Sequence, residues 1–452
     1  MSLNSLQKRR KQLAQLFDYP VILWSGKRLS RNFRANQYPF RANSHFLYFA
    51  GLPLENAVIR LSGGKLELFI DNPPPAATLW HGQMMTREEI ASQIGAESAY
   101  PLAHLATKTS DAATIPVQDE ITYREQCRLL KHNLSSTKAL EDKDLELAKA
   151  IVSIRLCHDD DALNELKKAA AVTVEAHKAG IKATLKAKTE SEVRSLMEAV
   201  IIAHNMSCAY NSIVTVQGEV LHNDRYHNLL QSGDLILADV GAETASGWAA
   251  DVTRTWAVSG KFSLTQRDIY DIVLEAHDRC IASMRPGVEY RDIHLLAATT
   301  IAEGLVDLGI LKGNPAHLVE RDAHALFFPH GVGHLLGLDV HDMENLGDVA
   351  GYEAGRDRSD RFGLEYLRLD RPLRSKMLVT IEPGFYQVGA ILNNAEFRQK
   401  YQLVVNWERL AQFSDVRGIR IEDDVLITDD GTEVLTNRLP NTVNELELMQ
   451  SN

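Results

Sequence analysis

Five residues in the second half of the sequence carry side chains that could bind metal ions together. They are four carboxylates and one imidazole: Asp239, Asp251, His334, Glu382 and Glu422. Four carboxylates cannot gather away from water without cations, because their like charges repel. Two divalent cations would balance them, and a water between two such ions loses its proton near neutral pH. If the five residues converge, the chain is a hydrolase with a dinuclear metal centre.

The first two candidates border a predicted hairpin. Asp239 ends the apolar run LILADVG, Asp251 opens the run DVTRTWAV, and a Ser-Gly turn signal lies between them. Two strands joined by a short turn form a hairpin, so both carboxylates could face one pocket. The alternative is that one aspartate caps a turn and the other is solvated, as most aspartates are. The apolar flanks favour burial, and a buried carboxylate needs a cation or hydrogen-bond donors.

Three histidines, His330, His334 and His341, lie in the segment FFPHGVGHLLGLDVHD. Its glycines argue against a regular helix and indicate a backbone that another group approaches closely. A single histidine is usually structural, but three in this frame favour a site in which one binds metal and the others meet substrate. Asp339 and Asp342 could orient a histidine ring.

The remaining candidates lie on two further strand-like runs. Glu382 follows MLVTI and precedes a Pro-Gly turn. Arg420 and Glu422 are two residues apart in GIRIEDDVLIT, so they share one face if this run is a strand. They could instead form a plain ion pair. Spacing alone does not choose the ligand among Glu422, Asp423 and Asp424, although alternation puts Asp423 on the other face from Glu422.

This ligand set offers oxygen and nitrogen donors and no thiolate. Such a set suits Mn²⁺, Co²⁺, Fe²⁺ or Zn²⁺ and argues against a structural zinc site. We expect two divalent ions, with Mn²⁺ as the first choice.

The elements that must position these residues fall into two parts. Residues 1–150 predict an α/β domain with strands at VILWSG, AVIRLSG and KLELFID, and residues 151–452 predict a mixed α+β domain with a substantial sheet. Between them, residues 140–205 show helical periodicity, and we place the linker near 135–160. Two further long helices are expected at 264–284 and 290–309.

Composition excludes several classes of protein. The net charge of −11 argues against a nucleic-acid surface, and no apolar run approaches the roughly 18 residues of a membrane span. The N-terminal segment MSLNSLQKRRKQLAQLF predicts an amphipathic helix and not a signal peptide. The four cysteines are widely spaced and form no CxxC pair, which indicates reduced thiols of a cytoplasmic protein.

The order of these motifs resembles a known family. DVG followed by SGWAADVTRT, then PHGVGHLLGLDVHD, TIEPGFY and GIRIEDDV are similar to the pita-bread metallopeptidases that cleave Xaa-Pro bonds, the aminopeptidase P and prolidase group. The resemblance covers roughly residues 150–440 and extends more weakly through YPFRANSHFLYFAGL and LWHG. It implies an α+β chain: a C-terminal pita-bread domain and a smaller α/β N-terminal domain used for substrate access and oligomer contacts.

The resemblance also implies roles for the metal ligands. Asp251 and Glu422 would bridge two metal ions, Asp239 would serve one ion, and His334 and Glu382 would serve the other. A metal-bridging hydroxide would attack the scissile carbonyl, and Glu382 would act as general base.

Further residues match substrate-facing positions of the family. His222, His330 and His341 match the histidines near the substrate amide and carbonyl, where donors stabilise developing charge. The others are Arg420 beside the last ligand, Tyr386 after the EPG turn, Trp80 in LWHG, which would reach the active site of a neighbouring subunit, and His45, which stands where aminopeptidase P has Asp.

The resemblance thus implies an Xaa-Pro aminopeptidase acting on proline-containing peptides as a homodimer or homotetramer. The long stretch before TIEPG and the insertion between Tyr386 and Arg420 look more like prolidase, the dipeptidase alternative, while TRT looks more like aminopeptidase P. A non-catalytic binding protein, a metal-free creatinase-type enzyme and a methionine aminopeptidase are remoter alternatives. The first two typically lack metal ligands that are all present here, and the third seldom carries such an N-terminal domain.

Overall fold

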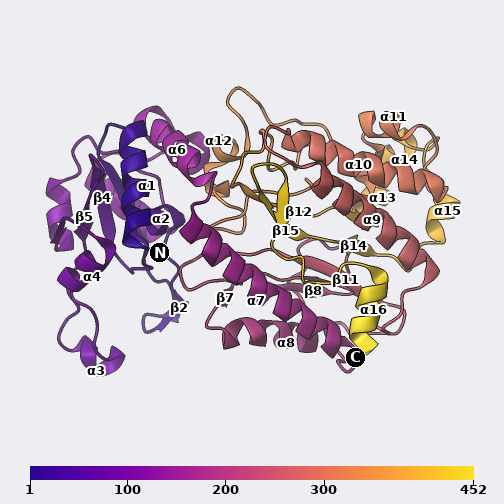
Figure 1. Ribbon diagram of the computed structural model, residues 1–452, viewed down its shortest axis with the longest axis horizontal. Helices are drawn as coiled ribbons and strands as arrows, with labels where there is room; N and C mark the ends of the chain where they lie inside the picture. The colour runs from indigo at the N-terminus through magenta and orange to yellow at the C-terminus, as the bar shows by residue number, and fades with distance from the viewer. Residues whose placement is uncertain (452) are drawn as a thin grey trace. The chain divides into compact units, whose positions relative to one another are not determined.

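A computed structural model describes residues 1–451 of the chain (Figure 1). The contacts divide it into two compact units. The first unit comprises Met1–Leu163 and Met343–Ala350, and the second comprises Asn164–Asp342 and Gly351–Asn452. The boundary at residue 150, expected from the change in composition, stays a prediction. Among the described residues, no helix combines the length and the apolar character needed to cross a membrane.

The first unit is built on a four-stranded sheet in the order β1-β4-β5-β6. All neighbours are antiparallel except the pair β5 and β6. Its core is formed by Ile22, Trp24, Val58 and Phe69, which come from the first three of these strands. The strands of this unit are β1 Val21–Trp24, β2 Ser30–Phe33, β3 Asn36–Gln37, β4 Val58–Ser62, β5 Lys65–Phe69 and β6 Ser98–Tyr100.

The helices of the first unit begin with α1, as the amphipathic N-terminal segment predicts. The capping residue Ser2 accepts a hydrogen bond from the Ser5 amide, which satisfies an amide that the helix leaves unpaired. These helices are α1 Leu3–Leu16, α2 Ser44–Ala50, α3 Ala77–His81, α4 Arg87–Ile94, η1 Leu102–Thr107, α5 Glu120–Leu130, η2 Thr137–Ala139, α6 Asp142–Arg155, η4 Glu344–Leu346 and α12 Asp348–Gly351. The linker expected near 135–160 is largely helical, because α6 occupies most of it.

The second unit contains several small sheets where one substantial sheet was expected. Two are three-stranded, β11-β9-β8 and β12-β15-β16, and two are the pairs β13-β14 and β10-β7. Their strands are β7 Ser207–Cys208, β8 Ile213–Thr215, β9 Leu235–Asp239, β10 Ala242–Glu243, β11 Thr253–Ala257, β12 Leu378–Ile381, β13 Gly384–Tyr386, β14 Gly418–Arg420, β15 Asp423–Ile427 and β16 Thr432–Val434.

Long helices flank these sheets, and α9 and α10 lie side by side (Figure 1). Both were expected from the sequence within two residues of their observed ends. The helices are α7 Asp160–Thr184, α8 Glu190–Ala203, α9 Leu264–Ser283, α10 Tyr290–Asp307, α11 Pro315–Glu320, η3 Ala323–Leu326, α13 Gly389–Leu392, α14 Ala395–Lys400, α15 Trp407–Ala411 and α16 Val443–Ser451.

The run GIRIEDDVLIT was expected to be one strand, and this expectation is wrong. It forms β14 and β15, and Ile421 and Glu422 lie between them. The two strands belong to different sheets: β14 pairs with β13, and β15 pairs with β12 and β16. The chain changes partners at this point, so Glu422 does not sit within a regular strand.

Candidate metal centre

Asp239 and Asp251 approach each other at the ends of β9 and β11. Asp239 is the last residue of β9 and pairs with Thr253, while Asp251 precedes β11 by two residues. Gly241 allows this close return of the chain, because a Cβ atom there would lie 1.9 Å from the Ala250 carbonyl oxygen.

A tyrosine lies between the two aspartates. The Tyr210 hydroxyl oxygen is 2.5 Å from one carboxylate oxygen of Asp239 and 2.5 Å from one of Asp251. A hydroxyl has one proton and donates to only one of them. The other contact therefore requires a proton on the carboxyl group itself, or a cation that draws the oxygens together.

Glu382 and Glu422 lie at one end of a second strand pair. Ile381 of β12 is opposite Asp423 of β15, so the residue after β12 and the residue before β15 meet at the same edge. The Glu422 amide donates to the Thr253 carbonyl over 3.0 Å, and the Thr253 hydroxyl donates to the Glu422 carboxylate over 2.7 Å. These bonds connect Glu422 to the strand that follows Asp251.

His334 comes from the glycine-rich loop. The loop is not helical, as its glycines predicted, and a Cβ atom at Gly333 would lie 2.2 Å from the Thr380 carbonyl oxygen of β12. His334 Nδ1 donates to the Leu335 carbonyl over 3.0 Å, so in the neutral ring Nε2 is the nitrogen that can act as a metal ligand. Nε2 lies 3.3 Å from Asp251 and 3.5 Å from Glu382.

The geometry and the electrostatics of this cluster suit a cation. Asp251, His334 and Glu422 each offer a ligand atom, and these atoms lie within 4.8 Å of one another. Burial, with the charge of Asp239, raises the pKa of Asp251 to about 8. Burial, with the charge of Asp251, raises the pKa of Glu422 well above its usual value. Without cations the cluster must hold protons, and divalent ions would replace them.

Arg420 is the main positive charge of the site. Its guanidinium donates to Asp239 over 2.6 Å, to the Thr253 hydroxyl over 3.0 Å and to the Tyr386 hydroxyl over 3.0 Å. One cation cannot neutralise four carboxylates, so the pKa values of Asp251 and Glu422 stay raised although Arg420 is present. The sequence left open an ion pair between Arg420 and Glu422. In the structure Arg420 forms its ion pair with Asp239.

The three other histidines expected at the site belong to the same unit. His330 Nε2 is 2.9 Å from the Tyr386 hydroxyl, and burial lowers the pKa of His330 to about 3, so its ring is neutral. The His341 ring centre is 4.3 Å from that of His334. His222 is half-buried, and burial, with the charge of Arg420, lowers its pKa.

Two of the expected substrate residues lie in the first unit. Trp80 is 77% exposed on α3. His45 is buried on α2, where its Nδ1 accepts a hydrogen bond from Arg155 over 3.0 Å and its Nε2 is 3.2 Å from the Asn345 side-chain amide.

Two contacts at the site were not found from the sequence. Tyr210 stands in the run CAYNSIV, where no spacing or charge pattern distinguishes it from a core tyrosine. Asp424 accepts a hydrogen bond from the Asp251 amide over 3.1 Å, which supports a neighbouring ligand. The structure also separates the three consecutive acids: Glu422 faces the cluster, whereas Asp423 binds Arg254.

Two known protein families match successive parts of this chain. A family model described as metallopeptidase family M24 matches residues 164–429, and one described as the N-terminal domain of aminopeptidase P matches residues 6–118. The chain belongs to metallopeptidase family M24. The expected metallopeptidase class is thereby confirmed, and divalent metal ions belong to the chemistry of this family.

Individual relatives of this M24 metallopeptidase agree with the assignment. It is 31% identical to a human Xaa-Pro dipeptidase, over 98% of this chain and 90% of the relative. It is 30% identical to a probable Xaa-Pro aminopeptidase of Sordaria macrospora, over 88% and 84%. Aminopeptidase P from E. coli, solved with the inhibitor Pro-Leu, matches with a TM-score of 0.80 and 27% identity, over 100% and 98%. The expected pita-bread α+β fold with a smaller N-terminal domain is confirmed.

Proposed function

We propose that this protein is an Xaa-Pro aminopeptidase, which hydrolyses the bond between an N-terminal residue and a following proline. The observation that carries the proposal is the convergence of His334, Asp251 and Glu422, with Glu382 and Asp239 beside them. The relatives named for Xaa-Pro hydrolysis support the choice of bond.

We further propose two divalent ions at this site, with Mn²⁺ as the first candidate. Asp251 and Glu422 would be shared between the ions, Asp239 would serve one, and His334 and Glu382 the other. Such ions would polarise the scissile carbonyl and lower the pKa of the attacking water. The oxygen-rich donor set supports Mn²⁺ over a metal that prefers thiolates.

The residues around the ligands have separate proposed tasks. Burial raises the pKa of Glu382 above its usual value, which suits a group that accepts the proton of the attacking water. His222, His330 and His341 would hold the substrate amide and carbonyl as hydrogen-bond partners. Arg420 and Tyr386 would hold His330 in place, since Arg420 donates to the Tyr386 hydroxyl and this hydroxyl contacts His330.

A second candidate function is Xaa-Pro dipeptidase activity. The observation that favours it is the match to the human dipeptidase along nearly the whole chain. The two activities share the bond and the metal centre, and they differ in whether a residue follows the proline.

One experiment separates the two activities. The purified protein, loaded with Mn²⁺, is incubated with Xaa-Pro dipeptides and with Xaa-Pro-Yaa tripeptides, and the released N-terminal residue is measured. Cleavage of tripeptides alone establishes the aminopeptidase, and cleavage of dipeptides alone establishes the dipeptidase. Cleavage of neither, with metal shown to be bound, would refute both.

Roles outside the second unit are proposals of the same kind. We propose that the protein forms a homodimer or homotetramer in which exposed Trp80 reaches a neighbouring subunit, and that His45 belongs to the substrate-recognition region. The four cysteines are thiols in the structure, which supports a cytoplasmic location. Trp80→Ala tests the proposed role of Trp80. The variant is expected to lose Xaa-Pro cleavage, and its molar mass in solution shows whether the oligomer persists.

A further inference from the structure

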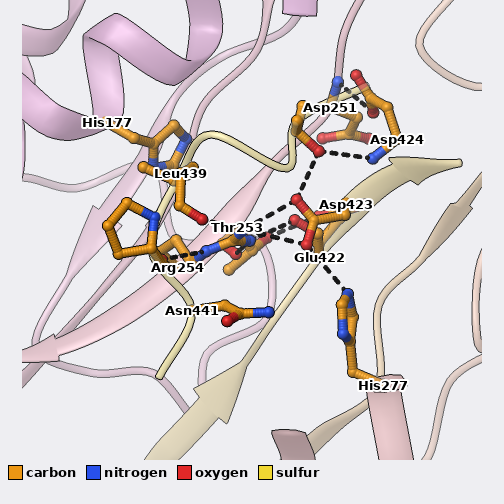
Figure 2. A network of polar contacts seen from close by, with 12 residues as sticks. His177, Asp251, Thr253, Arg254, His277, Glu422, Asp423, Asp424, Leu439 and Asn441 are labelled. Carbon is orange, nitrogen blue, oxygen red and sulfur yellow. Dashed lines mark hydrogen bonds and ion pairs between the residues drawn. The ribbon is translucent and has the colours of Figure 1, made fainter. Parts of the chain in front are cut away.

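Arg254 is a fully buried arginine that points away from the metal ligands. It lies between Thr253 and Thr255 on β11, and alternation turns its side chain to the opposite face of the strand. Thr253 and Thr255 both contact Glu422 or Arg420, whereas Arg254 forms the centre of the polar network in Figure 2. Thr253 and Thr255 therefore face the metal site, and Arg254 lies on the other face of the strand.

Every N–H group of the Arg254 guanidinium has an acceptor. Nε donates to the Pro440 carbonyl over 2.9 Å. One terminal nitrogen donates to the carbonyls of Thr253 and Glu422, over 3.0 and 2.7 Å. The other donates to the Asp423 carboxylate over 2.8 Å and to the Leu439 carbonyl over 3.3 Å. Because these five donors form a rigid planar fork, the acceptors fix the orientation of the buried guanidinium.

The contact with Glu422 falls where the strand is interrupted. Glu422 lies between β14 and β15, so no neighbouring strand in either ladder accounts for its carbonyl. Its amide donates to the Thr253 carbonyl, and its carbonyl accepts from Arg254. β11 thus binds the backbone of Glu422 twice, through the Thr253 carbonyl and through the side chain of Arg254.

Asp423 is held by the same network. It accepts hydrogen bonds from Arg254 and from the Thr436 hydroxyl, and His277 Nε2 forms an ion pair with it at 3.1 Å. The backbone of Glu422 is therefore fixed at its own carbonyl and at the side chain of the next residue.

We infer that Arg254 is a positioning residue, which sets the direction of the Glu422 carboxylate toward the metal site by clamping the backbone at Glu422 and Asp423. This inference rests on the proposed metal-binding function. Lysine cannot replace Arg254, because an ammonium group has three donors in a compact head and cannot reach five acceptors in one plane.

The test is the affinity of the purified full-length protein for Mn²⁺, measured by isothermal titration calorimetry. Arg254→Lys is expected to weaken binding at one or both sites by about 10- to 100-fold, the usual effect of losing a group that orients a ligand. Arg10→Lys is the matched control, since Arg10 is a buried arginine of the first unit that donates to the Phe49, Ile94 and Gly95 carbonyls. Its Mn²⁺ affinity is expected to equal that of the wild type.

Thr436→Val is the milder second variant and decides the matter if Arg254→Lys does not fold. It removes one hydrogen bond to Asp423 and is expected to weaken Mn²⁺ binding by about fivefold. Wild-type affinity in a folded Arg254→Lys protein, or in Thr436→Val, overturns the inference. A wild-type protein that binds Mn²⁺ but cleaves no Xaa-Pro peptide refutes only the proposed activity, and one that binds no divalent ion refutes both.

Discussion

Glu422 and Asp423 are neighbours in the chain and both are buried, yet their environments are opposite. Glu422 faces other carboxylates, and burial with the charge of Asp251 raises its pKa. Asp423 faces Arg254, His277 and Thr436, and Arg254 is the first of the neighbours that lower its pKa despite burial. One acid has its charge balanced by the protein, and the other does not.

The contrast teaches where a cation is needed. A buried carboxylate is stable when the fold supplies a countercharge and donors, as it does for Asp423. Around Glu422 the pKa stays raised although Arg420 lies beside several acids, so the remaining charge calls for ions from solution. Buried charge without a countercharge is therefore a better indication of this site than the number of acidic residues.

The largest expected effect is on catalysis. Glu382→Gln keeps the shape of the side chain and removes its ability to accept a proton, so kcat for an Xaa-Pro substrate should fall by about 10²- to 10⁴-fold. Steady-state kinetics in excess Mn²⁺ measure it. Glu433→Gln is the matched control on the surface of the same unit, where the glutamate pairs with Lys167. Unchanged kcat in Glu382→Gln would remove Glu382 from the chemistry.

The two neighbouring acids should respond in opposite ways when each is altered. Asp423→Ala leaves Arg254 buried without its countercharge and should lower the free energy of unfolding by about 3–5 kcal/mol. Glu422→Gln puts a neutral amide where burial and the neighbouring acids already disfavour a charged carboxylate, so the metal-free protein should be about as stable as the wild type or more stable. Urea unfolding in excess chelator measures both, and equal losses in the two variants would contradict the comparison.

The pH dependence of stability should also distinguish metal-free from metal-loaded protein. The pKa of Asp251 is about 8 in the folded state, above its value in the unfolded chain. At pH values between these two pKa values, the folded state therefore holds a proton that the unfolded state has lost. Stability of the metal-free protein should therefore fall as pH rises, by about 2 kcal/mol between pH 6 and pH 8. Metal binds the deprotonated ligands and should reverse this trend. Thermal unfolding with chelator and with Mn²⁺, across this range, is the measurement.

The smallest effect should come from the tyrosine between the aspartates. Tyr210→Phe removes one hydrogen bond to Asp239 or Asp251 and should weaken Mn²⁺ binding by about fivefold. Tyr226→Phe is the control, since its hydroxyl donates to the Ser212 carbonyl. Equal Mn²⁺ affinity in the two variants would show that Tyr210 contributes no more than a core residue.

Much of this arrangement could be predicted from the chain alone. Apolar runs that end in a single acid gave the strand ends at Asp239 and Glu382, and the glycines around His334 predicted a loop under close approach. Helical periodicity located α9 and α10 nearly to their ends. These features are local, because strand period, helix period and glycine conformation act within a few residues.

Other features depend on residues far apart in the sequence and could not be predicted. Glu422 and Asp423 are chemically similar acids, and what distinguishes them is their distant neighbours, above all Arg254, which is 169 positions from Asp423. The change of sheet between Arg420 and Asp423 depends on the partners β13 and β12, which local alternation does not reveal. Tyr210 likewise becomes informative only when two distant aspartates are placed at its hydroxyl.

The first compact unit includes Met343–Ala350, which directly follows His341 and Asp342 in the chain. Within that unit, Asn345 lies against buried His45 of α2. A single cut in the chain therefore does not separate the two units as their contacts define them. A fragment beginning at residue 164 would still contain Met343–Ala350, a segment that belongs to the first unit. A chain break after Asp342, where the chain passes from one unit to the other, would lie next to His341, a histidine of the proposed active site.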